Sequence, residues 1–173
     1  MLAPIFYQQS SDLLGLCQVD SPVGRLQLTA SAQGLVSVLR EDQPSPVTVV
    51  VHHPDVEAVT THLVKTATQL NEYFAGQRQQ FDLALDMRGT AFQQQVWQTL
   101  LAIEYGHHCA YVDIAQRINR PNACRAVGAA NGANPIAIIV PCHRVIGKSG
   151  KLTGYAYGVE MKQFLLDLEQ RYA

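Results

Sequence analysis

Residues 91–103, AFQQQVWQTLLAI, open the second half of the chain with a clear helical pattern. Its apolar residues, among them Phe92 and Val96, recur at the spacing of one face of an amphipathic helix. Two further helical segments are expected at residues 112–118 and 122–133. Short helices joined by short polar or proline-containing connections are typical of a helix-turn-helix, so we expect one here.

The rest of this half is expected to hold one more helix and one apolar run. Asn122 is expected to be the N-cap of the third helix. Residues 136–140 are apolar and strand-like, and Pro141 ends the run because proline fixes φ and lacks a backbone donor. A last amphipathic helix is expected at residues 158–171, with an inner face of Met161, Phe164, Leu165 and Leu168.

The first half predicts a small α+β unit. Interleaved apolar and polar residues, separated by turns, predict strands at residues 14–19, 25–30 and 35–39. A helix follows from Pro54 and is expected to end at Gly76, after a loop at residues 41–51. The alternation at residues 81–85 predicts an edge strand. A linker at residues 86–90 then separates two domains, 1–87 and 88–173.

Composition is that of a globular protein, with 47% hydrophobic and 16% charged residues among 173. We expect no signal peptide, because no basic region precedes an apolar stretch, and no membrane span. The four cysteines lack any CxxC pair, a pattern that favours reduced thiols in the cytoplasm over disulfides or a metal site.

Charge is divided unevenly along the chain. Residues 1–87 have a net charge of −5, whereas residues 88–173 have a net charge of +4. If the protein meets a polyanion, we expect the C-terminal half to contact it. Chance segregation of surface charge is the alternative, and the overall charge of −1 argues against purely electrostatic binding of nucleic acid.

The sequence Pro141-Cys142-His143 provides the candidate nucleophile. A thiol becomes a nucleophile when it ionises, and a neighbouring histidine favours the thiolate. A Cys-His pair alone is more often a buried structural cysteine beside an accidental basic neighbour. The surrounding sequence is needed to separate the two readings.

The helix that follows Asn122 is unusual because nearly all its side chains are small, with Arg125 the single long one. Small residues let a helix approach another surface closely, and a lone arginine can then insert into a DNA duplex. The alternative is close helix–helix packing with Arg125 on the surface. The residues of this helix alone do not separate these possibilities.

Residues 89–169 resemble the C-terminal domain of the O6-alkylguanine-DNA alkyltransferases, also called methylated-DNA–protein-cysteine methyltransferases. The matching stretches, in an order and spacing that make chance unlikely, are GTAFQ (89–93), Tyr111, RAVGAANG (125–132), NP (134–135), PCHRVI (141–146) and TGYA (153–156). The first half matches weakly, at DSPVG (20–24) and QGL (33–35). The resemblance implies an α+β fold with an N-terminal RNase H-like domain and a winged helix-turn-helix-like C-terminal domain. Residues 145–146 and 151–152 would form its wing-like hairpin.

The resemblance implies a suicide reaction in DNA repair. Cys142 would attack the alkyl carbon on O6 of guanine and keep the alkyl group as a thioether, so that each molecule reacts once. His143 would take the thiol proton through a water, and Glu169 would orient His143. Asn134 would brace the active-site turn. Without the resemblance, Glu169 would be read as an ordinary solvated residue.

The resemblance also implies how double-stranded DNA carrying O6-alkylguanine is bound. The target base would be flipped into a pocket through the minor groove, Arg125 would fill the vacated space, and Tyr111 would promote rotation and donate to guanine N3. Ala126 and Ala129 would contact DNA beside Arg125. The substrate pocket would be lined by Val145, Tyr155, Ala156 and Tyr157. No cofactor is needed, and the protein is expected to act as a monomer.

Two departures from the family pattern matter. Tyr157 stands where glycine is usual, so we expect a narrower pocket lip and altered tolerance of bulky alkyl groups. Some family members hold a structural zinc in the first domain. The matching positions here include Ser31 and Val36, which are not ligands, so no metal is expected.

Two functions of other classes remain as alternatives. A DNA-binding regulator of the same fold would not need Cys142. An ordinary cysteine hydrolase could use His143 as base, but consecutive residues of an extended segment point to opposite sides, which strains direct pairing. Turnover separates these possibilities, because a hydrolase gives many products per molecule and an alkyltransferase gives one.

Overall fold

The computed structural model describes residues 4–9, 12–40, 53–150, 152 and 154–173. The chain divides into two compact units, Met1–Met87 and Arg88–Ala173. Among the residues that the structure describes, none of the helices combines the length and the apolar character needed to cross a membrane.

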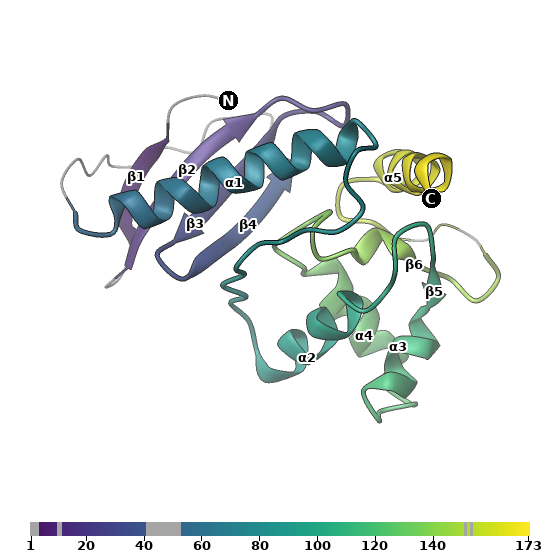
Figure 1. The fold of residues 1–173 in the computed structure, drawn as a ribbon. Coiled ribbons are helices and arrows are strands. Elements are labelled where there is room, and N and C mark those ends of the chain that lie inside the picture. Colours follow the sequence, from purple (N-terminus) through teal and green to yellow (C-terminus); the bar gives the residue numbers. More distant parts are fainter. Residues whose placement is uncertain (1–3, 10–11, 41–52, 151, 153) are drawn as a thin grey trace. The chain divides into compact units, whose positions relative to one another are not determined.

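The first unit contains a four-stranded antiparallel sheet (Figure 1). Its strands are β1 (Ile5–Gln9), β2 (Asp12–Val19), β3 (Leu26–Ser31) and β4 (Gly34–Arg40), and they lie side by side in chain order. The strands β2, β3 and β4 confirm the sequence prediction, whereas β1 was not predicted. The expected loop at residues 41–51 lies outside the described residues.

Helix α1 (Val56–Phe74) crosses one face of this sheet (Figure 1). The apolar side chains of its inner face, including Val59 and Leu63, are fully buried, whereas Val64 is exposed. Gly15 of β2 permits the close approach, because a Cβ at this position would collide with Cγ1 of Val59. The helix ends just before Gly76, as predicted, and Gly76 adopts a φ of 71°.

The predicted edge strand at residues 81–85 is wrong, because only Leu85 forms a bridge with β4. The Leu35 amide donates to Ala84 O at 2.9 Å, and the Asp86 amide donates to Leu35 O at 2.8 Å. The Ser31 hydroxyl also donates to the Asp86 carboxylate at 2.7 Å. The segment therefore touches the sheet at one residue and then turns away, which is too short a contact to form a strand.

The second unit is built on α2 (Ala91–Leu100), α3 (Tyr111–Arg117) and α4 (Cys124–Gly132), which contact one another and confirm the predicted helical segments (Figure 1). Thr90 begins α2 with a reciprocal capping box, in which its hydroxyl accepts from the Gln93 amide and its own amide donates to the Gln93 side chain. Trp97 of α2 is buried and donates its indole N–H to Ala130 O of α4 at 2.8 Å. This bond fixes α4 against α2.

Two local predictions for this unit are wrong, and a third lies partly outside the described residues. The N-cap of α4 is Ala123 rather than Asn122, and no side chain caps it. Residues 137–139 form a turn, between a bridge at Ile136 and a bend at Val140, rather than an extended run. Strand β6 (Val145–Ile146) pairs in parallel with β5 (Cys109–Ala110), and the wing-like hairpin expected with residues 151–152 stays a prediction. Lys151 lies outside the described residues, and Leu152 is not in a strand.

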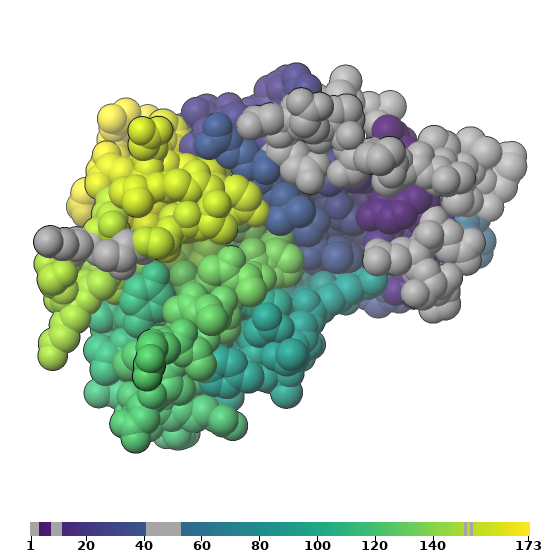
Figure 2. Space-filling view, turned by 180° about the vertical axis from the view of Figure 1, so that it is seen from behind, coloured from purple at the N-terminus to yellow at the C-terminus, as the bar shows by residue number. Residues whose placement is uncertain are grey.

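Helix α5 (Val159–Tyr172) confirms the predicted last helix. Met161, Leu165 and Leu168 are buried as expected, but Phe164 is 38% exposed, so its assignment to the inner face is wrong. Figure 2 shows α5, in yellow, at the surface of its unit. The helix therefore buries one face and exposes the other, and the buried face contacts the 3₁₀ helix η1 (Cys142–Arg144).

Candidate active site around Cys142

The turn before Cys142 is held by side-chain amides rather than by a strand ladder. Asn134 Oδ1 accepts from the Ile136 amide at 3.0 Å, and Asn134 Nδ2 donates to Val140 O at 2.8 Å. Within this turn Ile138 has a φ of 73°, a conformation that β-branched residues rarely adopt. Asn134 is itself buried, and its two bonds satisfy the Ile136 amide and the Val140 carbonyl in the interior of the unit.

Cys142 is the first residue of η1 and is only 4% exposed. Its carbonyl accepts from Asn131 Nδ2 of α4 at 3.3 Å, so α4 and the turn of Asn134 position it together. Since Cys142 and His143 lie in a 3₁₀ helix, the expectation that they point to opposite sides of an extended segment is wrong. The argument against direct Cys–His pairing drawn from that expectation no longer holds.

His143 is fully buried and points toward α5. Its Nε2 lies 2.7 Å from Oε1 of Glu169, which is also fully buried. An ionised carboxylate only accepts hydrogen bonds, so this contact assigns the hydrogen to Nε2 and leaves Nδ1 as an acceptor. His143 Nδ1 is buried and has no hydrogen-bond partner among the described residues.

Arg144 also binds Glu169. Its Nε donates to Oε2 at 2.8 Å, and its Nη2 donates to Oε1 at 2.9 Å. The Gly106 amide lies 3.3 Å from Oε2 as a further donor. Glu169 is thus a buried carboxylate with both oxygens occupied, as burial of a charge demands.

The site is uncharged at Cys142 and His143 near neutral pH. Burial raises the pKa of the Cys142 thiol, and the Asn134 amide, the Tyr155 hydroxyl and the Lys162 ammonium oppose that shift. Burial lowers the pKa of His143, although its hydrogen bond to Glu169 acts in the opposite direction. A neutral thiol therefore stands beside a neutral imidazole, which has an acceptor nitrogen available.

Tyr111 is the first residue of α3 and is half-buried. Its ring lies against Gly128 of α4, where an added Cβ would stand 3.9 Å from two ring carbons. Burial, and then the nearby Cys142, raise the pKa of Tyr111, so its phenol keeps its proton at neutral pH. Tyr111 therefore lies against α4 and near enough to Cys142 for the two groups to affect each other's ionisation.

The segment after η1 brings two more tyrosines to the site. Burial and the nearby Cys142 raise the pKa of Tyr155, and its ring meets that of Tyr157 edge-on with centroids 5.8 Å apart. Both rings are half-buried, and Ala156 between them is exposed. Thr153, which belongs to the matching stretch 153–156, lies outside the described residues. Val145 is buried, and its carbonyl accepts from Lys162 Nζ at 2.6 Å.

Lys162 is a residue of the site that the sequence reasoning missed. It is fully buried on α5, burial lowers its pKa, and the nearby Cys142 acts in the opposite direction. Its spacing gave a signal, because Lys162, Leu165 and Glu169 recur at the positions of one helix face. A lysine and a glutamate on a buried face mark a polar site.

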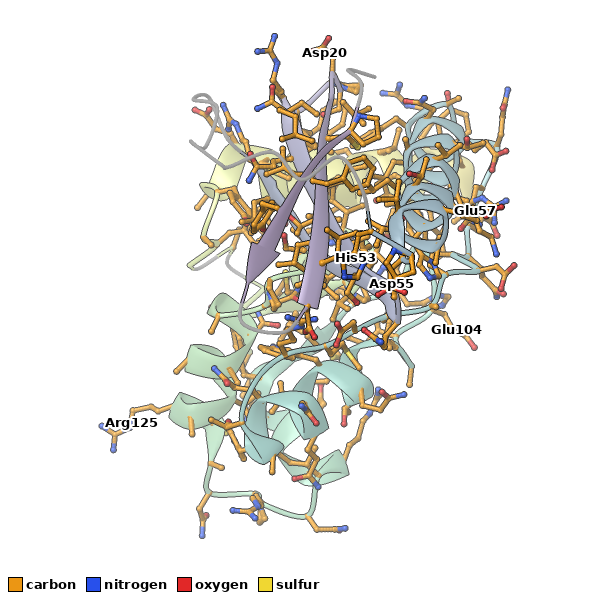
Figure 3. All side chains as sticks on the ribbon, turned by 90° about the vertical axis from the view of Figure 1, so that its left-hand side faces the viewer. Asp20, His53, Asp55, Glu57, Glu104 and Arg125 are labelled. Atoms are coloured by element: carbon orange, nitrogen blue, oxygen red, sulfur yellow. The ribbon has the colours of Figure 1, made fainter. Side chains whose placement is uncertain are left out.

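Arg125, Ala126 and Ala129 lie together on the exposed side of α4. Figure 3 shows Arg125 extending away from the helix into solvent. The structure thus places these three residues on an open helix surface, while the residues around Cys142 lie in the interior of the same unit. Asn131 and Tyr111 connect the two regions.

At the positions considered for zinc, the Ser31 hydroxyl is taken by Asp86. In the part of the chain that the structure describes, no group of three or more histidine, cysteine or acidic side chains is arranged to hold a metal ion.

Glu169 should make the stability of this unit depend on pH in the acid range. Burial alone would raise its pKa, but the hydrogen bonds from His143 and Arg144 and the charge of the guanidinium outweigh burial and hold the pKa at about 2, below the ordinary 4.5. The stabilisation is complete above pH 4.5 and is lost as the pH falls toward 2. The difference between these two pKa values corresponds to a contribution of about 3 kcal/mol to the free energy of unfolding.

The measurement is denaturant unfolding between these pH values, followed by circular dichroism, for the parent and Glu169→Gln. We expect a flatter dependence of the unfolding free energy on pH in the variant, whatever its absolute stability. Glu160→Gln, which changes an exposed glutamate of the same helix, is the control and should keep the parent's slope. Equal slopes for the parent and Glu169→Gln would contradict the assignment.

Two family models match the chain, one over each unit. The model of the 6-O-methylguanine DNA methyltransferase ribonuclease-like domain matches residues 16–87. The model of the DNA binding domain of the same family matches residues 91–171. The two matches confirm the resemblance drawn from the motifs and the predicted combination of a ribonuclease-like and a DNA-binding domain.

Relatives and solved structures agree with the family that the two models indicate. Methylated-DNA–protein-cysteine methyltransferase of Mycobacterium tuberculosis is 49% identical over 152 residues, covering 88% of this chain and 90% of that protein. The Methanosarcina acetivorans protein of the same name is 46% identical and covers 87% of this chain and 94% of its own.

The crystal structure of Mycobacterium tuberculosis O6-methylguanine methyltransferase matches with a TM-score of 0.78 at 46% identity, covering 92% of this chain and 94% of that chain. A complex of the mycobacterial protein with DNA matches with the same TM-score at 47% identity, covering 90% and 92%. Since matched domains span nearly the whole sequence, the chain belongs to the 6-O-methylguanine DNA methyltransferase family.

Proposed function

We propose that this protein repairs DNA by transferring the alkyl group of O6-alkylguanine to Cys142 in a single, stoichiometric reaction. The observation that supports this most directly is the arrangement of Cys142, His143 and Glu169 in one buried cluster next to the helices of a DNA-binding domain. A nucleophile, a base and a group that orients the base are the parts that covalent catalysis requires.

In the proposed reaction the Cys142 sulfur attacks the alkyl carbon while the bond from that carbon to guanine O6 breaks. The thiol proton passes to Nδ1 of His143 through a water, because Nε2 is held by Glu169. The electron pair of the broken bond stays on guanine, and Tyr111 donates a proton to N3 as the base departs. Guanine and a thioether on Cys142 are the products, and the tyrosine and histidine regain their starting protonation by exchange with water.

The surrounding residues have supporting roles in this proposal. Asn134 braces the turn that carries Cys142, as its bonds to Ile136 and Val140 indicate. The pocket for the flipped base is lined by Val145, Tyr155, Ala156 and Tyr157. We also propose that the protein acts as a monomer, without a cofactor, in the cytoplasm, where reduced thiols persist.

On the DNA side, we propose that α4 lies against the minor groove. Arg125, which extends from the open face of α4, enters the base stack, while Ala126 and Ala129 let the helix backbone approach the duplex (Figure 3). A surface with a single long side chain reads little sequence, which suits a protein that acts wherever damage occurs.

The decisive experiment is incubation with a duplex oligonucleotide that carries O6-methylguanine, followed by the mass of the intact protein. We expect one addition of about 14 Da per molecule, from the net gain of CH₂ in the proposed thiol alkylation. Cys142→Ala should gain no mass, whereas Cys124→Ala, which removes a thiol of α4, should react like the parent. Release of many product molecules per protein would instead show a hydrolase.

Arg125→Ala should slow the reaction on duplex DNA because the vacated position in the stack is left empty. Unstacking costs a few kcal/mol, so we expect a single-turnover rate roughly tenfold to a hundredfold lower. On a single-stranded oligonucleotide, where no duplex must open, the variant should approach the parent's rate. Arg171→Ala, an exposed arginine of α5, is the matched control. An equal loss on both substrates would argue against insertion of Arg125 into the duplex.

Tyr157 should restrict the size of the alkyl group, since its ring meets Tyr155 at the proposed pocket lip. We expect Tyr157→Gly to raise the rate with O6-benzylguanine relative to the rate with O6-methylguanine, and Tyr157→Phe, which keeps the ring, to retain the parent's preference. Rates on duplexes carrying each base give the comparison. An unchanged ratio in the glycine variant would show that Tyr157 does not shape the pocket.

A further inference from the structure

The Glu169 carboxylate is shared by two consecutive residues of η1. Oε1 accepts from both His143 Nε2, at 2.7 Å, and Arg144 Nη2, at 2.9 Å. Oε2 accepts from Arg144 Nε at 2.8 Å. His143 and Glu169 are fully buried, and Arg144 is 6% exposed. His143, the base of the proposed reaction, and the guanidinium of Arg144 therefore donate to the same carboxylate oxygen.

Arg144 is held in place from several sides. Its Nη1 donates to Ile103 O, just beyond α2, at 2.6 Å. Its guanidinium carbon also lies 5.7 Å from the centroid of the Tyr105 ring, which is in the range of cation–π contacts. A planar guanidinium with two parallel bonds to one carboxylate fixes the orientation of that carboxylate, which a lysine ammonium does not do. Arg144 thus orients Glu169, and Glu169 orients His143.

The charges of the cluster determine where its protons lie. The groups that face His143 are Glu169 and Lys162 from α5, with Arg144 and Cys142 from η1, and Tyr105 stands behind Glu169 and Arg144. Of these, only Glu169 favours a protonated imidazole, while Arg144 and Lys162 disfavour it. Because the guanidinium cancels the charge of the carboxylate at hydrogen-bond distance, the pull of Glu169 on a second imidazole proton is weakened.

We propose that Arg144 is a positioning residue for the alkyl transfer: it orients Glu169 and neutralises its charge, so that His143 stays neutral with Nδ1 open to the Cys142 proton. This inference rests on the proposed function. It assigns to Arg144 a task that suits its planar guanidinium, which binds both oxygens of Glu169, whereas the Lys162 ammonium donates to Val145 O at 2.6 Å. Burial is the main cause that lowers the pKa of His143, and Arg144 adds to it by offsetting the charge of Glu169. Without Arg144 the carboxylate would favour a second proton on the imidazole, and an imidazolium cannot accept the proton of a thiol.

The test uses three variants of the full chain. Arg144→Met removes both the positive charge and the pair of hydrogen bonds to Glu169. Arg144→Lys keeps the charge but cannot form that pair of parallel bonds. Arg144→Met combined with Glu169→Gln removes both opposite charges at once. Arg171→Met, at an exposed position of α5, is the matched control. Two readouts are compared, the protonation of the His143 imidazole by NMR titration and the single-turnover rate against pH on a duplex carrying O6-methylguanine.

We expect Arg144→Met to move the titration of His143 upward by about one pH unit or more, with the acid limb of the rate profile moving by the same amount. The double variant should return the titration toward the parent's position, which a purely structural loss would not do. Arg144→Lys should keep the parent's titration but react roughly tenfold more slowly at every pH, because its carboxylate is less well oriented.

An unchanged His143 titration in Arg144→Met overturns the proposal, as does a loss of rate that is equal at all pH values in that variant. If Arg144→Met does not fold, Arg144→Lys decides, and a parental rate in that variant overturns the orienting role. Failure of the proposed function would look different, because the parent itself would gain no mass from O6-methylguanine DNA while its His143 could still be titrated.

Discussion

A buried carboxylate governs the architecture of the C-terminal unit. Glu169 can remain ionised in the interior only while donors surround both of its oxygens, and these come from η1 and from the turn after α2. The same set of hydrogen bonds to Glu169 therefore holds three parts of the unit together. These parts are helix α5, the 3₁₀ helix η1 and the turn at Gly106. Apolar contacts of Leu165 and Leu168 bring the helix close, and the charge fixes its register.

The nucleophile itself depends on a second constraint, which concerns the backbone. The turn of residues 134–141 pairs some of its backbone groups internally, as in the bond from the Val140 amide to Ile136 O, and Asn131 and Asn134 supply further hydrogen bonds. These amides permit the positive φ of Ile138 and aim Cys142 inward. Placement of a reactive thiol thus follows from two asparagines more than from regular secondary structure.

The sequence predicted those parts of the molecule whose cause is local. Helical spacing gave α1, α2, α3 and α5, and interleaved residues gave β2, β3 and β4, because periodicity reports the burial of one face. The alternation at residues 81–85 led to a wrong strand prediction. A strand forms only where a neighbouring strand runs alongside it, and this segment meets β4 only at Leu85. Asn122 has the chemistry of a cap, but the chain begins α4 one residue later than that role requires. The helical spacing of Lys162 and Glu169 indicates a shared face. Arg144 and Glu169 come together only in space, so the role of Arg144 could not be read from the sequence.

The bond between Trp97 and Ala130 has a practical consequence. Trp97 is the single tryptophan of the chain, and its indole N–H is bonded to the helix that bears Arg125. Indole emission responds to the loss or strain of such a bond and to entry of water. Any shift of α4 relative to α2 should therefore change the intrinsic fluorescence, which gives this unit a built-in optical reporter that needs no label.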